Sequence, residues 1–245
     1  MARIQQILLT LKHNPLRWLV FIVLFALIYY ASLLLSLMIS FGNPPNYYRV
    51  YDWFGNVAEI IRATPSAADA YAIIKQEWAL EIGFMNYEYG FGISEWSLNI
   101  LPFKVLSVLL LALLLVLNWR LLRQARQNSV CSLPEQKSPG TKSLRVASAA
   151  TGLGAVLVSM ASMTMFWVVC CATPSWVVGL AMLGLVSAST ALFLDPYEGV
   201  VLWSGFILLA LSAWLLSGVV VRQTQVDNRP TAIPALSNGK PLGEA

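Results

Sequence analysis

Charged side chains are scarce in this chain of 245 residues: they make up 11% of it, against roughly 25% in soluble domains. Apolar side chains make up 58%, and the mean hydropathy is +0.66. A soluble globular domain is therefore excluded, and an integral membrane protein is expected. The apolar stretches run for about 20 residues without in/out alternation, which indicates helices and not the membrane strands of about 10 residues that build a barrel.

Cysteine and histidine are also rare, with three and one in the whole chain. Three cysteines exclude a disulfide framework, and two neighbouring cysteines form a strained bridge at best. His13 has no carboxylate or thiol near it in the sequence, so we expect no metal role for it. The net charge of +4 does not indicate nucleic-acid binding, because the basic residues cluster beside apolar runs, where membrane orientation explains them.

The order of the apolar runs predicts an all-α integral membrane protein with four to five hydrophobic helices. Trp18 begins the first span as an interfacial anchor, and the later runs cover 147–169, 176–194 and 200–221. No cleavable signal peptide is expected, because the first run is long and no small-residue cleavage site follows it. The expected divisions are a basic arm and first span over 1–41, an extracytoplasmic segment over 42–101, a second span over 102–118, a basic linker over 119–146, a membrane unit over 147–222 and an unstructured tail over 223–245.

The segment 42–101 carries seven of the twelve acidic residues and many aromatic ones, so it should fold. Ser66 reads as the cap of a helix that continues to about Ile82, and a shorter helix on residues 57–61 precedes it. Two interpretations stay open for this segment. It is either a docking face or lid, or an aromatic-rich cap that lies on the lipid headgroups.

Six basic residues against Glu135 alone lie between residues 119 and 145. By the positive-inside rule this linker and the N-terminus are cytoplasmic, which places 42–101 on the outer side of the membrane. The side of the C-terminus stays open, because five crossings would put it outside whereas Arg222 and Arg229 favour inside.

The third run is rich in small residues. Gly152, Ala155, Ser159 and Ser162 form a stripe on which another helix can pack closely.

Two adjacent thiols, Cys170 and Cys171, stand at the end of this run, and Pro174 follows them. Proline interrupts a helix, and a broken helix at membrane depth is expected only where protein or a water-filled cavity covers it. Thiolates are soft ligands that select soft ions such as Cu(I) and, by extension, Hg(II), and metal binding would release the thiol protons. The alternative is that both cysteines are small buried apolar residues that pack.

The segment from Lys142 to Arg222 resembles the bacterial mercuric ion transport proteins of the MerT and MerF type. The features that carry the resemblance come in this order: Lys142-Ser143-Leu144-Arg145-Val146, a small-residue helix, Cys170-Cys171-Ala172-Thr173-Pro174, a run through Gly179 and Gly184, Leu194-Asp195-Pro196-Tyr197, and a last helix with Gly205 and Ala213-Trp214. The resemblance implies a location in a bacterial inner membrane. It also implies that the cysteine pair accepts Hg(II) from the outer side and passes it to cytoplasmic thiols. Where the family carries a second cysteine pair, this chain offers only Cys131, so the relay would use one thiol.

The sequence thus predicts soft-metal transport or binding through Cys170, Cys171 and Cys131, without catalysis and with the ion as cargo. Expected partners are the lipid bilayer and an extracytoplasmic metal carrier or other membrane subunits. The alternative function is a non-catalytic accessory or assembly subunit of a larger membrane complex that docks a partner through 42–101. A membrane thiol redox protein is a third reading, which the lack of a Cys-x-x-Cys motif disfavours.

Overall fold

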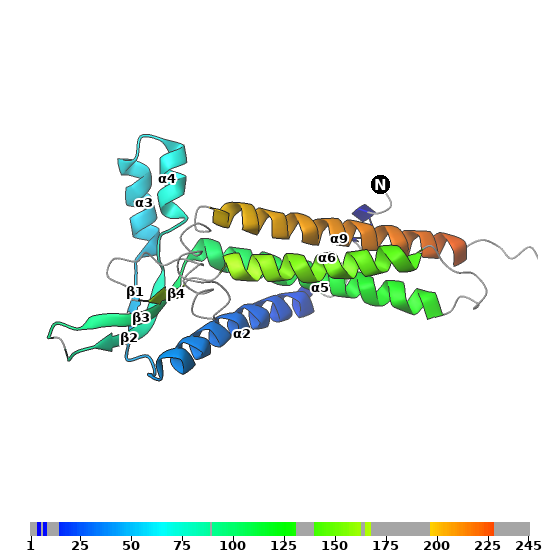
Figure 1. Cartoon of the computed structure of the whole chain (residues 1–245). Coiled ribbons are helices and arrows are strands. Elements are labelled where there is room, and N and C mark those ends of the chain that lie inside the picture. The colour runs from blue at the N-terminus through cyan, green and yellow to red at the C-terminus, as the bar shows by residue number, and fades with distance from the viewer. Residues whose placement is uncertain are drawn as a thin grey trace, which may run out of the picture.

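The computed structural model describes residues 4–5, 7–8, 15–88, 90–130, 140–162, 165–167 and 197–227. The main elements follow one another as α2 (Pro15–Phe41), β1 (Tyr47–Val50), α3 (Trp53–Ala63), α4 (Ala67–Ile74), β2 (Leu80–Asn86), β3 (Ile93–Ile100), α5 (Pro102–Val130), α6 (Gly140–Ala161), β4 (Met165–Trp167) and α9 (Glu198–Asp227). Figure 1 shows α2, α5, α6 and α9 as a bundle of long helices, with the strands and the two short helices gathered at one end of it. We call this end assembly, β1–β4 with α3 and α4, the sheet module.

Within the part of the chain that the structure describes, three helices are long and apolar enough to cross a membrane: Pro15–Phe41, Pro102–Gln127 and Glu198–Arg222. The apolar part of α6 is shorter and covers Val146–Ala161. These helices confirm the expected class of a multi-pass membrane protein with helical spans. The predicted fourth run over 176–194 lies outside the described residues, so the count of four to five helices stays a prediction.

The second span is longer than the sequence predicted. We expected it to end at Asn118, whereas α5 remains helical to Val130. The residues beyond Asn118 are mostly leucine, arginine, glutamine and alanine, which are good helix formers even where they leave the apolar layer. Helix α6 likewise begins at Gly140, so both ends of the expected linker are helical.

The expectation of an all-α protein is wrong, because the sheet module contains a four-stranded antiparallel sheet in the order β1-β2-β3-β4. Strands β2 and β3 form a hairpin whose turn uses Gly90 and Gly92 at φ +91° and +82°, values that favour glycine. Strand β4 comes from far along the chain and joins the edge of β3, pairing Trp96 with Trp167. The apolar run expected as helix over 147–169 therefore ends its helix at Ala161.

The two short helices were predicted in part. Helix α3 confirms the helix expected on residues 57–61, and its cap is Asp52, which accepts a hydrogen bond from the Gly55 amide at 3.0 Å. Ser66 caps α4 as expected. However, α4 ends at Ile74. Residues 75–79, which were expected to continue it, form a connection, and Leu80 to Ile82 begin β2.

The sheet rests on the end of α2. Leu33 and Leu37 of α2 form one buried cluster with Trp96 and Leu98 of β3, and Trp96 stacks on Phe41 with ring centroids 6.4 Å apart. This apolar contact connects the sheet module to the bundle.

Helices α6 and α9 pack at close range through two glycines. A Cβ added to Gly154 would lie 2.8 Å from the Gly205 carbonyl oxygen, and one added to Gly205 would lie 2.9 Å from that of Gly154. The predicted small-residue stripe is confirmed in part: Ala155 packs against the cluster of Leu111, Val158, Phe206 and Leu209, whereas a Cβ on Gly152 would meet nothing within 4 Å. Gly154, which makes the close contact with α9, was not part of the predicted stripe.

Trp18 does not lie at the surface as an interfacial anchor. Its side chain is 5% exposed and packs in a cluster with Leu121 of α5 and Leu216 of α9. The Arg120 guanidinium carbon lies 4.5 Å from the centre of its ring, a cation–π contact. Trp119, 66% exposed, is the tryptophan at this end that is placed as an anchor would be.

Candidate functional site

The predicted metal residues Cys131, Cys170 and Cys171 all lie outside the described residues, so the metal site stays a prediction. His13 lies outside them as well. Within the described ranges, no three His, Cys, Asp or Glu side chains lie together in a group that could hold a metal ion. The strand β4, which ends at Trp167 shortly before the thiol pair, belongs to the sheet module.

The first candidate site is the edge strand β1 of the sheet module. Among the described strands, β1 pairs on one side only, with β2. Its residues Tyr48 and Val50 are 77% and 71% exposed. In an antiparallel pair the main-chain groups point alternately toward and away from the partner strand. Since Tyr51 donates to Ala79 on the β2 side, Tyr48 and Val50 direct their amide and carbonyl groups toward the open edge.

A buried carboxylate holds β1 in place. Glu81 of β2 is 9% exposed and accepts hydrogen bonds from the Tyr47 hydroxyl at 2.8 Å and the Tyr51 hydroxyl at 2.6 Å. The Tyr47 hydroxyl also lies 2.8 Å from the Ser94 hydroxyl of β3. Burial raises the pKa of Tyr47 to about 12 and also raises the pKa of Tyr51, so both phenols stay neutral donors at physiological pH. These hydrogen bonds fasten β1 to β2 and β3.

Large apolar side chains are exposed elsewhere on the sheet module. Phe54 of α3 is 81% exposed, Tyr71 of α4 is 59% exposed, and Phe91 in the hairpin turn is fully exposed. An apolar hollow of about 450 Å³ lies where α3, α4 and the start of α5 meet, with Tyr71 packed edge-on against Phe103.

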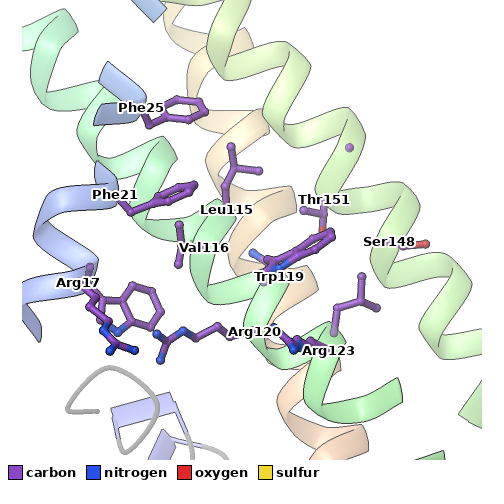
Figure 2. Close-up of a pocket in the computed structure, with 14 residues that line it drawn as sticks. Arg17, Phe21, Phe25, Leu115, Val116, Trp119, Arg120, Arg123, Ser148 and Thr151 are labelled. Carbon is purple, nitrogen blue, oxygen red and sulfur yellow. The ribbon is translucent and has the colours of Figure 1, made fainter. Parts of the chain in front are cut away.

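The second candidate site is a cavity of about 760 Å³ between α2, α5 and α6, which we call the arginine groove (Figure 2). Its lining residues are Arg17, Trp18, Phe21, Phe25, Leu115, Val116, Asn118, Trp119, Arg120, Leu122, Arg123, Ser148, Thr151 and Gly152. In Figure 2 the three arginines gather at one end of the groove and Phe25 lies toward the other. A volume of this size is in the usual range for small-molecule sites.

A polar cluster that the sequence analysis missed lies beside the groove and connects three helices. The Asn118 side chain donates to the Leu209 carbonyl of α9 at 3.2 Å and accepts from the Ser212 hydroxyl at 2.7 Å. The Ser212 hydroxyl also lies 2.5 Å from the Thr151 hydroxyl and 3.0 Å from the Ala147 carbonyl oxygen of α6, which is an alternative acceptor for its one proton. An asparagine inside a leucine-rich span was the available signal, because buried polar groups in membranes need partners.

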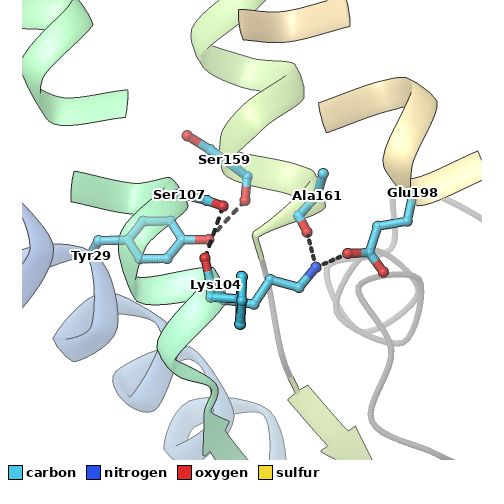
Figure 3. Close-up of polar contacts among 7 residues, drawn as sticks. Tyr29, Lys104, Ser107, Ser159, Ala161 and Glu198 are labelled. Carbon is cyan, nitrogen blue, oxygen red and sulfur yellow. Dashed lines mark hydrogen bonds and ion pairs between the residues drawn. The ribbon is translucent and has the colours of Figure 1, made fainter. Parts of the chain in front are cut away.

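A second polar cluster holds the opposite end of the bundle together (Figure 3). Lys104 of α5 forms an ion pair with Glu198 of α9 and donates to the Ala161 carbonyl of α6 at 2.6 Å. The Tyr29 hydroxyl of α2 donates to the Ser159 carbonyl of α6 at 2.7 Å. All four long helices are thus joined near the sheet module. This cluster has satisfied partners, which indicates a structural role.

Comparison with family models, with curated proteins and with solved structures finds no match to this chain. The resemblance to mercuric ion transport proteins therefore rests on the residues quoted for it, and it stays a prediction.

Proposed function

We propose that the protein is a non-catalytic accessory subunit of a membrane complex and that its sheet module docks an extended segment of another protein along β1. The observation that carries this proposal is the outer edge of β1, which pairs with no other described strand and where Tyr48 and Val50 present exposed side chains together with main-chain donors and acceptors. An extended peptide adds to such an edge through main-chain hydrogen bonds, and alternate side chains give specificity. Soluble proteins usually blunt exposed edges of this kind because they attract other chains.

Two features of the sheet module make β1 a suitable receiving strand. The two phenols that bind Glu81 hold the strand in register, so little conformational freedom is lost when a partner strand arrives. The contact with α2 through Trp96 and Leu98 holds the sheet at the end of the membrane spans. A partner strand would therefore come from a protein that reaches the membrane surface.

The test is site-specific photo-crosslinking from position 48 in native membranes, with position 91 as the matched control. We expect position 48 to crosslink to one extended segment of a different membrane protein. Tyr48→Lys combined with Val50→Lys should weaken that association at least about tenfold, because charged residues on an edge oppose strand addition. Phe91→Lys, which changes a fully exposed residue in the hairpin turn, should have no effect.

Crosslinks from position 48 that reach only lipid would refute docking along β1. Crosslinks to a second copy of this chain would also refute it and would indicate a homodimer formed by edge pairing.

The vicinal thiols support a second candidate function, which is soft-metal binding or transport with Cys170 and Cys171 as the accepting pair and Cys131 as a later acceptor. Neighbouring thiolates offer two soft ligands to one ion. Purified protein should bind one Hg(II) or Cu(I) ion per pair, and Cys170→Ser with Cys171→Ser should abolish this binding whereas Cys131→Ser should not. Metal stoichiometry that is unchanged in the double variant would remove the transport reading.

For orientation, we propose that the sheet module faces the outside of a bacterial inner membrane and that the opposite end of the bundle is cytoplasmic. The sheet module carries the acidic residues from Asp52 to Glu95, whereas Arg17, Arg120 and Arg123 lie at the other end of α2 and α5. This asymmetry agrees with the positive-inside rule. Protease accessibility of the hairpin turn in right-side-out and inverted vesicles tests the assignment, and cleavage only in inverted vesicles would reverse it.

A further inference from the structure

The arginine groove presents two different kinds of surface to whatever occupies it. Its apolar part consists of side chains such as Phe21 and Phe25 of α2 and Leu115 of α5. Its cationic end holds the guanidinium groups of Arg17 and Arg123, beside Arg120. A ligand that satisfies both surfaces has an anionic head and an apolar body.

The two arginines have no counter-charge in the described protein. Neither Arg17 nor Arg123 forms an ion pair with a described residue. The acidic residues between Asp52 and Glu95 belong to the sheet module, beyond the other end of the spans. A guanidinium at the edge of an apolar cavity is stabilised by an anion that reaches it from outside, since the low dielectric strengthens their attraction.

We propose that the arginine groove binds one anionic glycerophospholipid. Its phosphate accepts hydrogen bonds from Arg17 and Arg123, and one acyl chain lies along Phe21 and Phe25. Basic pockets between membrane helices on the cytoplasmic side bind such headgroups, and the bilayer supplies the ligand at high local concentration. This site is independent of partner docking along β1.

The shape of the groove supports a chain-bearing ligand over a free anion. The hydrogen bond from the Tyr29 hydroxyl to the Ser159 carbonyl joins α2 to α6 beyond Phe25, on the side of the sheet module, whereas the arginines line the other end of the groove. On the α6 wall, Gly152 leaves room for a chain, because a Cβ added there would meet nothing within 4 Å. An inorganic anion would leave this apolar volume unfilled.

The test measures lipid binding to the purified full-length protein by native mass spectrometry, with phosphatidylglycerol and phosphatidylcholine as probes. The charge variant is Arg17→Gln with Arg123→Gln. Its matched control is Arg62→Gln with Lys75→Gln, which removes two exposed cations from the sheet module. Arg120 is kept, because its contact with Trp18 is structural.

A second variant removes volume instead of charge. Gly152→Leu fills the groove without a clash, and Gly199→Leu is its control, because a Cβ there also meets nothing within 4 Å and Gly199 does not line the groove. Neither substitution disturbs a buried contact, so both proteins should fold. Leucine at position 152 should weaken binding of phosphatidylglycerol at least about tenfold, since the chain loses its place against the apolar wall.

We expect wild type to bind phosphatidylglycerol at least about tenfold more tightly than phosphatidylcholine, and the charge variant to lose about thirtyfold in affinity for phosphatidylglycerol. The two controls should bind as wild type does. Equal affinity for both lipids, or unchanged binding in both groove variants, would overturn the proposal. Displacement of phosphatidylglycerol by an equal concentration of inorganic phosphate would assign the site to a free anion, and a change in oligomeric mass in Gly152→Leu would assign the groove to a second copy of the chain.

Discussion

Replacing Asn118 by leucine removes the side chain that joins α5 to α9 through two hydrogen bonds. Asn118 is 1% exposed, so a leucine occupies the same buried space without a polar group. The lost bonds run to the Leu209 carbonyl at 3.2 Å and from the Ser212 hydroxyl at 2.7 Å. Both partners sit on α9, so the change loosens the contact between these two helices.

The structure limits how large the effect can be. Hydrogen bonds between membrane helices average about 0.6 kcal/mol and reach about 1.7 kcal/mol. The Leu209 carbonyl can still accept within its own helix, and the Ser212 hydroxyl can still donate to the Ala147 carbonyl at 3.0 Å. No group is left wholly unsatisfied, so we expect Asn118→Leu to lower the free energy of unfolding by about 1–2 kcal/mol.

Unfolding in mixed micelles of detergent and SDS measures this loss. Ser204→Ala is the matched control, since the Ser204 hydroxyl donates within its own helix to the Val201 carbonyl, and its cost should stay below about 0.5 kcal/mol. A double-mutant cycle of Asn118→Leu with Ser212→Ala should show a coupling of at least about 0.5 kcal/mol. If Asn118→Leu matched or exceeded wild-type stability, the cluster would not stabilise the bundle and the reasoning would fail.

Three further outcomes are expected. Gly154→Leu should unfold the bundle or force α6 away from α9, because its Cβ would lie 2.8 Å from the Gly205 carbonyl oxygen. Cysteine crosslinking between the two helices should then fall, and normal crosslinking would contradict this contact. Burial raises the pKa of Tyr47 to about 12, so the contribution of its neutral phenol to the stability of the sheet module should be full below about pH 10 and should be lost as pH rises through about 12. The phenolate absorbance of wild type, compared with that of Tyr47→Phe, gives the pKa of this residue. Ionisation of Tyr47 near pH 10 would refute the prediction. Glu198→Gln should destabilise the bundle by about 1–2 kcal/mol in SDS unfolding, because Lys104 loses the carboxylate that pairs with it. Adding Lys104→Met should recover part of this loss, since the unpaired charge is then removed. Full additivity of the two changes would argue against the ion pair.

Local signals in the sequence predicted several elements of the fold. The first span was expected from Trp18 to Phe41 and begins only slightly earlier, at Pro15, because a long apolar run needs no partner to specify a membrane helix. Ser66 was also expected as a helix cap. A cap needs only the serine hydroxyl and an amide three residues later, so it too can be predicted from neighbouring residues.

The sheet could not be predicted in this way. Strands β2 and β3 mix polar with apolar residues, and the apolar spacing of α4 continues past its end at Ile74 into the start of β2. Strand β4 is three residues long, and its Trp167 pairs with Trp96 of β3, on the other side of α5 and α6 in the sequence. No local pattern encodes such a contact.

The candidate sites divide along the same line. The thiol pair Cys170-Cys171 could be predicted as a candidate site because its two sulfurs are adjacent in the sequence. The arginine groove was not, although Arg17 and Arg123 were visible, because each also fits the ordinary role of a charge that orients a span. Only the packing of α2 against α5 brings these two arginines to one cavity.

By itself, the sequence determined that this is a membrane protein with long helical spans, that Ser66 caps a short helix, and where the basic residues concentrate. These properties follow from the composition of continuous stretches, whose energies depend on the solvent and on near neighbours. The tertiary structure alone decided which glycine pair brings α6 against α9, that a distant three-residue strand completes the sheet, and that Tyr47 and Tyr51 meet at Glu81. Each of these is a contact between residues far apart in the chain, whose existence depends on how whole elements pack.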